Sequence, residues 1–364
     1  MKYELCEKVR DLEPYEPITG EYPVRLDANE SFFPMPQTLR NTFKEIVDTL
    51  DFNRYPDPMA KEPVKAFADY YEIDPDHITA TNGSDEMLYL LASAMLTKGS
   101  KVVVAEPDFS MYRFYSFLSE NQVIAYQKNE MMQINVDKLI QTVSDNHADM
   151  VIFSNPCNPT GQGITAEDAR KLVNSVSALV VLDEAYMDFW DQSILKEAAD
   201  YDNLIVLKTA SKAVGAAAVR LGFAVANRTI TNALRAVKSP YNVNSVTQAF
   251  GTAIYREKDL LRQRCQKIID QTSALYQSLL KLNSTYYLDF DITEPCANFV
   301  FIRTPFAEKT FRYLLSKGIA VRYFGSAGAL RITAGNEEEN AAFLGALEQY
   351  VLENELTENL SKNR

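Results

Sequence analysis

A lysine flanked by hydroxyl side chains follows a predicted buried strand. The apolar run 204–207 has the length and β-branched character of such a strand, and Thr209, Ser211 and Lys212 come directly after it. A lysine amine can form a Schiff base with an aldehyde cofactor, and hydroxyl and guanidinium groups can hold its phosphate through paired hydrogen bonds. The stretch therefore predicts a site for a phosphorylated aldehyde. The alternative is a solvated lysine at a strand end, with Arg220 on the protein surface.

Polar and aromatic side chains also follow the other predicted strands. The residues that share a place just after an apolar run are Phe109, Asn158, Asp183, Tyr186, Thr209 and Lys212. In parallel α/β sheets, ligands bind beyond the carboxyl ends of the strands. These six residues therefore predict one converging site.

A second candidate phosphate contact lies at the start of a predicted helix. Gly83, Ser84 and Asp85 lead into the apolar stretch 87–96. Ser84 is a suitable N-cap, and the acidic residues after it suit the positive end of the helix dipole. Because a glycine-led helix N-terminus can bind a phosphate group, this start is a candidate anion site. The alternative is a simple cap with no ligand.

Two arginines lie inside short apolar strands near the C-terminus. Arg322 stands in the run 319–323 and Arg331 in the run 329–333. A buried arginine is costly unless an anion pairs with it, so each is a candidate anion ligand. The alternative is that each side chain points to solvent from an alternating strand.

Strand-like and helix-like stretches alternate through the first two thirds of the chain. The predicted strands are 101–104, 150–153, 179–182 and 204–207, and the predicted helices include 37–50 and one opened by the capping pattern of Thr165 to Asp168. This alternation predicts a mostly parallel sheet with helices on both faces. We expect an arm at 1–36 that packs with the small domain, a large domain at 37–255 and a small α+β domain at 256–364.

Composition narrows the functional classes. The 364 residues are 46% hydrophobic and 24% charged, as in ordinary globular proteins, and the net charge of −12 argues against nucleic acid as a partner. Four dispersed cysteines suggest neither disulfides nor zinc, and His77 and His147 are too far apart in sequence to support a metal site or a catalytic triad. The N-terminus lacks an apolar signal core and no stretch has the length of a membrane span. We therefore expect a reduced, cytoplasmic protein that does not bind membranes.

A dinucleotide-binding pattern provides a competing interpretation. Residues 161–166 match G-x-G-x-x-A, and Asp183 lies about twenty positions beyond, as that motif requires. The glycines should follow the strand directly, but Pro156 and Pro159 intervene. A dehydrogenase would also leave Lys212 and the arginines without a role, so this interpretation is the weaker one.

The motifs taken together resemble a known family. The stretches Asn158–Gly161, Asp183–Tyr186, Thr209–Ala213, Arg220 and Leu330–Thr333 occur in the order and spacing of fold-type I aminotransferases that use pyridoxal phosphate. A closer likeness, to histidinol-phosphate aminotransferases, rests on the stretches Leu26–Glu30, Arg54–Pro58, Gly83–Glu86 and Val321–Arg322. The resemblance covers nearly the whole chain. It implies a large α/β domain whose mostly parallel seven-stranded sheet lies between helices, plus a smaller α+β domain.

The resemblance also implies a role for each site residue. Lys212 would carry pyridoxal 5'-phosphate as a Schiff base and move the proton, and Asp183 would pair with the pyridine nitrogen. The residues that would hold the ring are Tyr186, Asn158 and Phe109, and those around the phosphate are Ser84, Asp85, Thr209, Ser211 and Arg220, with Tyr55 supplied by the neighbouring subunit of a homodimer. Substrate would be held by Tyr15, Asn29, Arg322 and Arg331, with Arg331 on a carboxylate and Arg322 and Tyr15 on a distal phosphate.

Departures from the family pattern bear on the substrate. Cys157 stands where the family usually has a second asparagine, and Phe109 where it has a tyrosine, so Phe109 can stack but cannot donate a hydrogen bond. The implied reaction is amino transfer between histidinol phosphate and 2-oxoglutarate in ping-pong half-reactions. The alternatives are an aminotransferase for aromatic or other amino acids, a threonine-phosphate decarboxylase, and a protein that binds the cofactor without catalysis.

Overall fold

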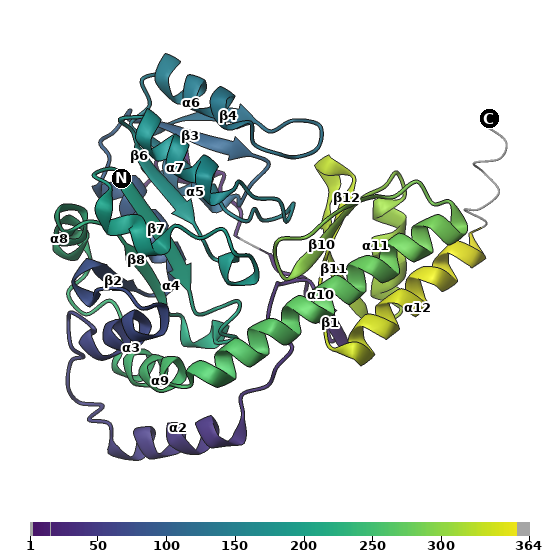
Figure 1. The fold of residues 1–364 in the computed structure, drawn as a ribbon, viewed down its shortest axis with the longest axis horizontal. Helices are drawn as coiled ribbons and strands as arrows, with labels where there is room; N and C mark the ends of the chain where they lie inside the picture. The colour runs from purple at the N-terminus through teal and green to yellow at the C-terminus, as the bar shows by residue number, and fades with distance from the viewer. Residues whose placement is uncertain (1–2, 15, 355–364) are drawn as a thin grey trace.

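The computed structural model describes residues 3–14 and 16–354. Its larger sheet contains seven strands, and Figure 1 shows how they are arranged. In sheet order, these strands are β2 (Ile78–Thr81), β8 (Gly222–Val225), β7 (Leu204–Thr209), β6 (Leu179–Asp183), β5 (Met150–Ser154), β3 (Lys101–Glu106) and β4 (Gln122–Gln127). All pairs between β4 and β7 are parallel, whereas β8 runs antiparallel to both of its neighbours. The predicted mostly parallel sheet is confirmed.

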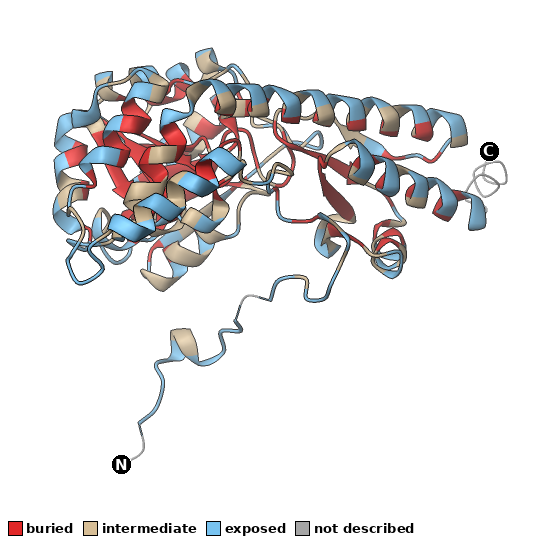
Figure 2. Ribbon diagram, turned by 90° about the horizontal axis from the view of Figure 1, so that it is seen from below, coloured by how far each residue is buried: buried red, intermediate tan, exposed pale blue. Residues whose placement is uncertain are grey.

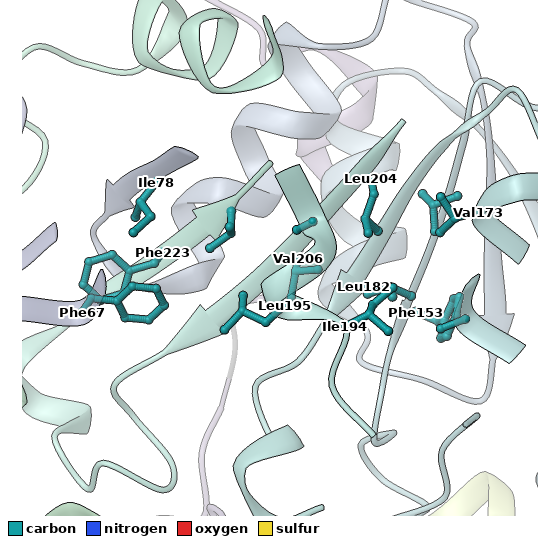
Figure 3. Packing of buried hydrophobic residues seen from close by; sticks show 14 of the residues in the cluster. Phe67, Ile78, Phe153, Val173, Leu182, Ile194, Leu195, Leu204, Val206 and Phe223 are labelled. Atoms are coloured by element: carbon teal, nitrogen blue, oxygen red, sulfur yellow. The ribbon is translucent and has the colours of Figure 1, made fainter. Parts of the chain in front are cut away.

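Helices cover both faces of this sheet. One face packs against α3 (Lys61–Tyr71), α6 (Val136–Asp145), α7 (Ala166–Ser175) and α9 (Ser245–Arg256), and the other against α4 (Gly83–Ala94), α5 (Met111–Leu118) and α8 (Arg228–Val237). In β5, Val151 and Phe153 join the first core, while Met150 and Ile152 join the second. Because side chains alternate along a strand, a continuous apolar run fills both cores. Figure 3 shows part of the first core, where Phe153 lies near Leu182.

A second sheet of five strands forms a smaller unit. Its order is β1 (Val24–Leu26), β11 (Ile319–Phe324), β12 (Ala329–Thr333), β10 (Phe299–Arg303) and β9 (Asp291–Thr293), and the helices α10 (Lys258–Tyr286), α11 (Ala307–Ser316) and α12 (Glu337–Glu353) pack around it. The long α10 runs from the helices of the larger sheet to the smaller one (Figure 1): Leu261 belongs to the first core, whereas Leu275 and Leu279 belong to the core of the small sheet. The residue boundaries of the domains stay a prediction.

The remaining elements include a predicted helix and several short turns. The helix α2 (Gln37–Thr49) confirms the helix expected at 37–50, and its Phe43 stacks on Phe250 of α9 with ring centroids 3.9 Å apart. The short elements are α1 (Glu7–Arg10) and the 3-10 turns η1 (Pro75–His77), η2 (Met187–Phe189), η3 (Leu195–Asp200), η4 (Ala217–Val219) and η5 (Gly325–Ala327). Figure 2 shows the exposed N-terminal stretch that precedes β1.

The N-caps of α7 and α4 were both predicted, and one of the two predictions is confirmed. Thr165 is the N-cap of α7, and its hydroxyl accepts a hydrogen bond from the Asp168 amide at 3.1 Å, as predicted. The predicted cap of α4 by Ser84 is wrong, because Gly83, with φ +76°, turns the chain into the helix two residues earlier. The N-cap is therefore Asn82.

The N-terminal arm is more ordered than its composition suggests. Val24–Leu26 form β1, which pairs in parallel with β11. Residues 24–26 of the arm therefore belong to the small sheet, and their pairing fixes them relative to Arg322 of β11. Within the described ranges, no helix combines the length and the apolar character that crossing a bilayer requires.

Candidate active site

The carboxyl ends of neighbouring strands bring predicted site residues to one edge of the larger sheet. Asp183 is the last residue of β6 and lies opposite Ser154, the last residue of β5. Thr209 ends β7, next to β6. Phe109 and Asn158 follow β3 and β5 beyond the same edge. This edge is where ligands bind in α/β sheets of this kind.

Lys212 lies half-buried in the turn that follows β7. The Gly215 amide donates to its carbonyl at 2.9 Å, and Gly215 has φ +70°, with Ser31 packed so closely that a Cβ would lie 3.0 Å from its Cβ. The Lys212 Nζ donates to the Ala28 carbonyl at 3.0 Å and lies 5.7 Å from the ring centroid of Tyr186. The amine is thus tied to the backbone of a distant N-terminal segment, and its role as the cofactor lysine stays a prediction.

A short N-terminal segment, residues 27–29, connects side chains from distant parts of the chain. Besides the Lys212 contact at Ala28, the carbonyl of Asp27 accepts a hydrogen bond from Arg331 Nη2 at 2.6 Å. Asn29 Nδ2 is placed 2.9 Å from the Tyr186 hydroxyl, to which it donates. Asn29 is 1% exposed and has φ +54°, a conformation that asparagine tolerates better than most residues. This segment therefore fixes an amine, a guanidinium and a phenol around one point.

Asp183 is a buried carboxylate whose neighbouring charges are also negative. The Tyr112 hydroxyl donates to its Oδ2 at 2.9 Å, and the Ala185 amide donates to its Oδ1 at 3.1 Å. Burial, helped by the carboxylates of Asp108 and Asp85, raises the pKa of Asp183 to about 6 against the effect of these hydrogen bonds. A cationic ring nitrogen placed here would supply the missing positive charge.

The Arg220 guanidinium lies against the start of α4. A Cβ on Gly83 would stand 2.7 Å from Arg220 Nη2, so only glycine permits this approach. Arg220 Nη2 lies 3.5 Å from Asp85 Oδ2, and Arg220 Nη1 donates to the Ala217 carbonyl at 3.2 Å. Arg220 itself has φ +53°. These contacts fix a guanidinium at a helix N-terminus, an arrangement that attracts an anion.

Two hydroxyl groups lie beside the same helix start. Thr209 Oγ1 donates to Ser211 Oγ at 3.0 Å and accepts from the Ser211 amide at 3.2 Å. Thr209 is the register partner of Gly222 in β8, and a Cβ on Gly222 would lie 2.5 Å from the Ser84 amide nitrogen. No side chain caps the helix from position Asn82. The hydroxyls, the guanidinium and the helix N-terminus therefore form a cradle that fits a phosphate.

Arg331 and Arg322 lie on one face of the small sheet. They are register partners in the antiparallel pair of β12 and β11, so their side chains project on the same side. Arg331 is 7% exposed and donates to Asn158 Oδ1, and its guanidinium carbon lies 5.3 Å from the ring centroid of Phe299. Arg331 therefore does not point to solvent, and Arg322 is half-buried. Two adjacent guanidinium groups favour an anion between or beside them.

Of three further predicted residues, Phe109 lies at the edge of this cluster, whereas Tyr55 and Tyr15 are not placed in it. The ring of Phe109 packs edge-on against Tyr112, with centroids 5.6 Å apart and an interplanar angle of 83°. Tyr55 is 80% exposed and stacks on Tyr241 at 4.5 Å, so it does not join the other site residues within this chain. Tyr15 lies outside the described residues.

Several contacts to predicted site residues were missed from the sequence. Tyr112 is the second residue of the helix that begins just after Phe109, and a tyrosine so close to a strand exit was the available signal. Thr333 Oγ1 accepts from the Asn29 amide at 2.9 Å, and Asn298 Nδ2 donates to the Asn29 carbonyl at 3.2 Å. No local pattern predicts these two contacts, because Asn29 lies in a distant part of the chain.

A buried ion pair supports the loops that carry Phe109 and Asn158. Lys128 Nζ lies 3.3 Å from Asp108 Oδ2, and the two side chains are 1% and 0% exposed. Burial lowers the pKa of Lys128, but Asp108 and Cys157 together raise it by more, so the lysine stays charged. Asp108 accepts from the amides of Phe109 and Ser154 at 2.8 and 3.2 Å, and Lys128 donates to Cys157 Sγ at 2.9 Å. The pair thus ties the exits of β3, β4 and β5 together.

Comparison with known proteins agrees with this geometry. The family model for aminotransferase class I and II matches residues 22–347. The histidinol-phosphate aminotransferase of Clostridium novyi is 39% identical over 342 residues, which cover 93% of this chain and 95% of that protein. Among solved structures, histidinol-phosphate aminotransferase from Sinorhizobium meliloti in complex with pyridoxal-5'-phosphate has a TM-score of 0.85 at 20% identity and covers 99% of both chains. L-threonine-O-3-phosphate decarboxylase from Porphyromonas gingivalis has a TM-score of 0.77 at 22% identity, over 90% of this chain and 99% of that one. Because the family model spans both sheets, the chain belongs to the class I and II aminotransferases.

Proposed function

We propose that this aminotransferase uses pyridoxal 5'-phosphate, bound at Lys212, to exchange an amino group between histidinol phosphate and 2-oxoglutarate. The observation that carries the cofactor assignment is the buried Asp183 carboxylate, whose neighbouring charges are negative. A protonated pyridine nitrogen would supply the positive charge that Asp183 lacks. The phosphate cradle at the start of α4 lies along the same sheet edge. When bound, the cofactor supplies an electron sink for the pair left on the substrate carbon.

The chain's own residues divide the remaining tasks. The Lys212 amine holds the cofactor and then moves the proton at the reacting carbon as a general base and acid. Asn29 donates to the Tyr186 hydroxyl, which leaves that hydroxyl's own proton directed toward a ligand oxygen. Phe109 covers the ring by stacking. Asp183 keeps the ring nitrogen protonated, and Arg220 holds the phosphate with the helix start.

The arginine pair on the small sheet supports the choice of substrate. Histidinol phosphate carries a phosphate and 2-oxoglutarate carries two carboxylates, so each half-reaction brings an anion to the same region. Arg331, fixed by Asp27 and Asn158, would bind a carboxylate through paired hydrogen bonds, and Arg322 beside it would hold the phosphate. Relatives named histidinol-phosphate aminotransferase support this choice.

The exposed Tyr55 supports a homodimer. Its ring is 80% exposed and rests on Tyr241, itself 46% exposed, so two aromatic side chains stand on the surface of one chain. We assign Tyr55 to the phosphate of the neighbouring subunit's cofactor. Sedimentation of the holoenzyme should show a dimer. Tyr55→Phe should weaken cofactor binding without dissociating the dimer. A monomer with full activity would contradict this assignment.

The substrate assignment is tested by following both half-reactions with purified holoenzyme. Histidinol phosphate should convert the bound cofactor to its amine form, and 2-oxoglutarate should restore the original spectrum. Threonine phosphate with detection of carbon dioxide tests the decarboxylase alternative, and aromatic amino acids test the broader aminotransferase alternative. Turnover of one of these at a higher kcat/KM than histidinol phosphate would replace the proposed substrate while leaving the cofactor chemistry in place.

A further inference from the structure

The Tyr112 side chain lies directly behind the proposed ring-nitrogen contact. Tyr112 is the second residue of α5 and is 2% exposed. Its hydroxyl donates to Asp183 Oδ2 at 2.9 Å, while the Ala185 amide occupies Oδ1. The carboxylate is thus held by one hydrogen bond on each oxygen. Of these, the Tyr112 bond is the one made by a side chain.

The surrounding hydrogen bonds fix the direction of the Tyr112 proton. An ionised carboxylate only accepts hydrogen bonds, so the Tyr112 hydroxyl must be the donor to Asp183. The nearby Ser154 hydroxyl donates to Asp108 Oδ1, and Asp108 is neutralised by Lys128 at 3.3 Å. Asp108 therefore has its own donors and does not compete for the Tyr112 proton.

The charged groups around Asp183 make this donor important. Asp108 and Asp85 disfavour its ionisation, although Lys128 faces Asp108 and Arg220 faces Asp85. Burial raises the pKa of Asp183, and the Tyr112 hydrogen bond is the first contact that lowers it. Removing this hydroxyl would leave a buried carboxylate that takes up a proton more easily.

We propose that Tyr112 is a positioning residue that holds the Asp183 carboxylate oriented and negatively charged for the cationic ring nitrogen of the cofactor. This inference rests on the proposed function, since it concerns the partner of that nitrogen. Tyr112 acts through Asp183 and does not itself touch the reacting atoms. It therefore sets cofactor affinity and electronic state rather than substrate recognition.

The test measures binding of pyridoxal 5'-phosphate to apoenzyme by quenching of the single tryptophan, Trp190, across a pH series. Tyr112→Phe should weaken binding at neutral pH by about tenfold to a hundredfold, as expected for one hydrogen bond to a charged group. The pH midpoint for binding should rise by about one to two units. The control Tyr115→Phe removes a hydroxyl from the same helix, where the ring packs against Tyr89 at 5.9 Å, and should bind as wild type.

Two further comparisons separate positioning from a general structural effect. A carbocyclic cofactor analogue with CH in place of the ring nitrogen should bind wild type and Tyr112→Phe with equal affinity. In an Asp183→Asn background, adding Tyr112→Phe should change affinity for the natural cofactor little, because the carboxylate is already absent. Tyr112→His, which keeps a ring N–H donor, gives a second variant at this position and should bind more tightly than Tyr112→Phe.

The outcomes distinguish this inference from the function on which it rests. Wild-type apoenzyme that fails to bind pyridoxal 5'-phosphate would overturn the proposed function. Wild type that binds, together with a Tyr112→Phe variant of equal affinity and pH midpoint, would overturn the role of Tyr112 alone. An equal loss of affinity for the cofactor and for the carbocyclic analogue would show a general structural effect and would also overturn it.

Discussion

Replacing Lys128 with methionine should destabilise the protein far more than an ordinary surface substitution. The change leaves the Asp108 carboxylate buried without its cation, because both side chains are almost fully enclosed. Breaking a buried ion pair by removing one partner costs about 3–5 kcal/mol. We expect a loss of about 3 kcal/mol, at the lower end, because Asp108 keeps hydrogen bonds from the amides of Phe109 and Ser154 and from the Ser154 hydroxyl.

The assay is urea unfolding of apoenzyme at neutral pH, followed by the fluorescence of Trp190. The matched control is Lys196→Met, which breaks the pair between Lys196 and Glu72 at 2.7 Å, where both side chains are mostly exposed. Exposed pairs contribute little, so this variant should unfold at nearly the wild-type urea concentration. The double variant Lys128→Met with Asp108→Asn should recover part of the loss, because the unpaired charge is gone.

The same variant should affect the active site. Lys128 also donates to the Pro107 carbonyl at 2.8 Å and to Cys157. It therefore holds the loops that carry Phe109 and Asn158. Cofactor affinity should therefore fall together with stability. If Lys128→Met unfolded at the same urea concentration as Lys196→Met, the buried ion pair would not stabilise the fold and the reasoning would be refuted.

Three further predictions concern the site and its pH dependence. Lys212→Ala should abolish transamination while leaving the thermal unfolding midpoint close to wild type, because it removes the proposed cofactor amine; measurable turnover would contradict it. Arg322→Ala should weaken transition-state binding of phosphorylated amines, measured from kcat/KM, by about 2–5 kcal/mol, with a smaller effect on unphosphorylated amines. Equal losses for both would show that Arg322 is not the phosphate ligand. Burial raises the pKa of Glu184 to about 7 from the ordinary 4.5. The folded state then binds this proton more tightly than the unfolded state, so stability should fall by about 3 kcal/mol as pH rises from about 4.5 to 7. Urea unfolding of Glu184→Gln across that range should lack this component, and an identical pH profile for wild type and variant would exclude it.

The sheet and its loops were predictable because their signals are local. The apolar runs that became β5, β6 and β7 are short and continuous, as strands buried on both faces must be. The alternation with helices then required a parallel sheet, and that topology placed the residues after each strand on one edge. Asp183 and Lys212 could be named for this reason without knowledge of any contact.

The contacts that complete the site were not predictable in this way. Asn29 meets Thr333 and Asn298 across most of the chain's length, and no periodicity relates such positions. The strand β1 was missed because three residues in a proline-rich arm give too short a pattern, and its pairing with β11 is a tertiary event. The prediction of Ser84 as the cap was wrong because a left-handed Gly83 begins the helix two residues earlier.

The decisive measurement is the absorption spectrum of the purified protein after incubation with pyridoxal 5'-phosphate, followed by addition of histidinol phosphate. We expect a yellow protein that bleaches to the amine form with this substrate and recovers with 2-oxoglutarate. Borohydride reduction followed by peptide mapping should place the cofactor on Lys212. A protein that stays colourless, or a cofactor attached to another lysine, would contradict the central claim that Lys212 and Asp183 form the cofactor site.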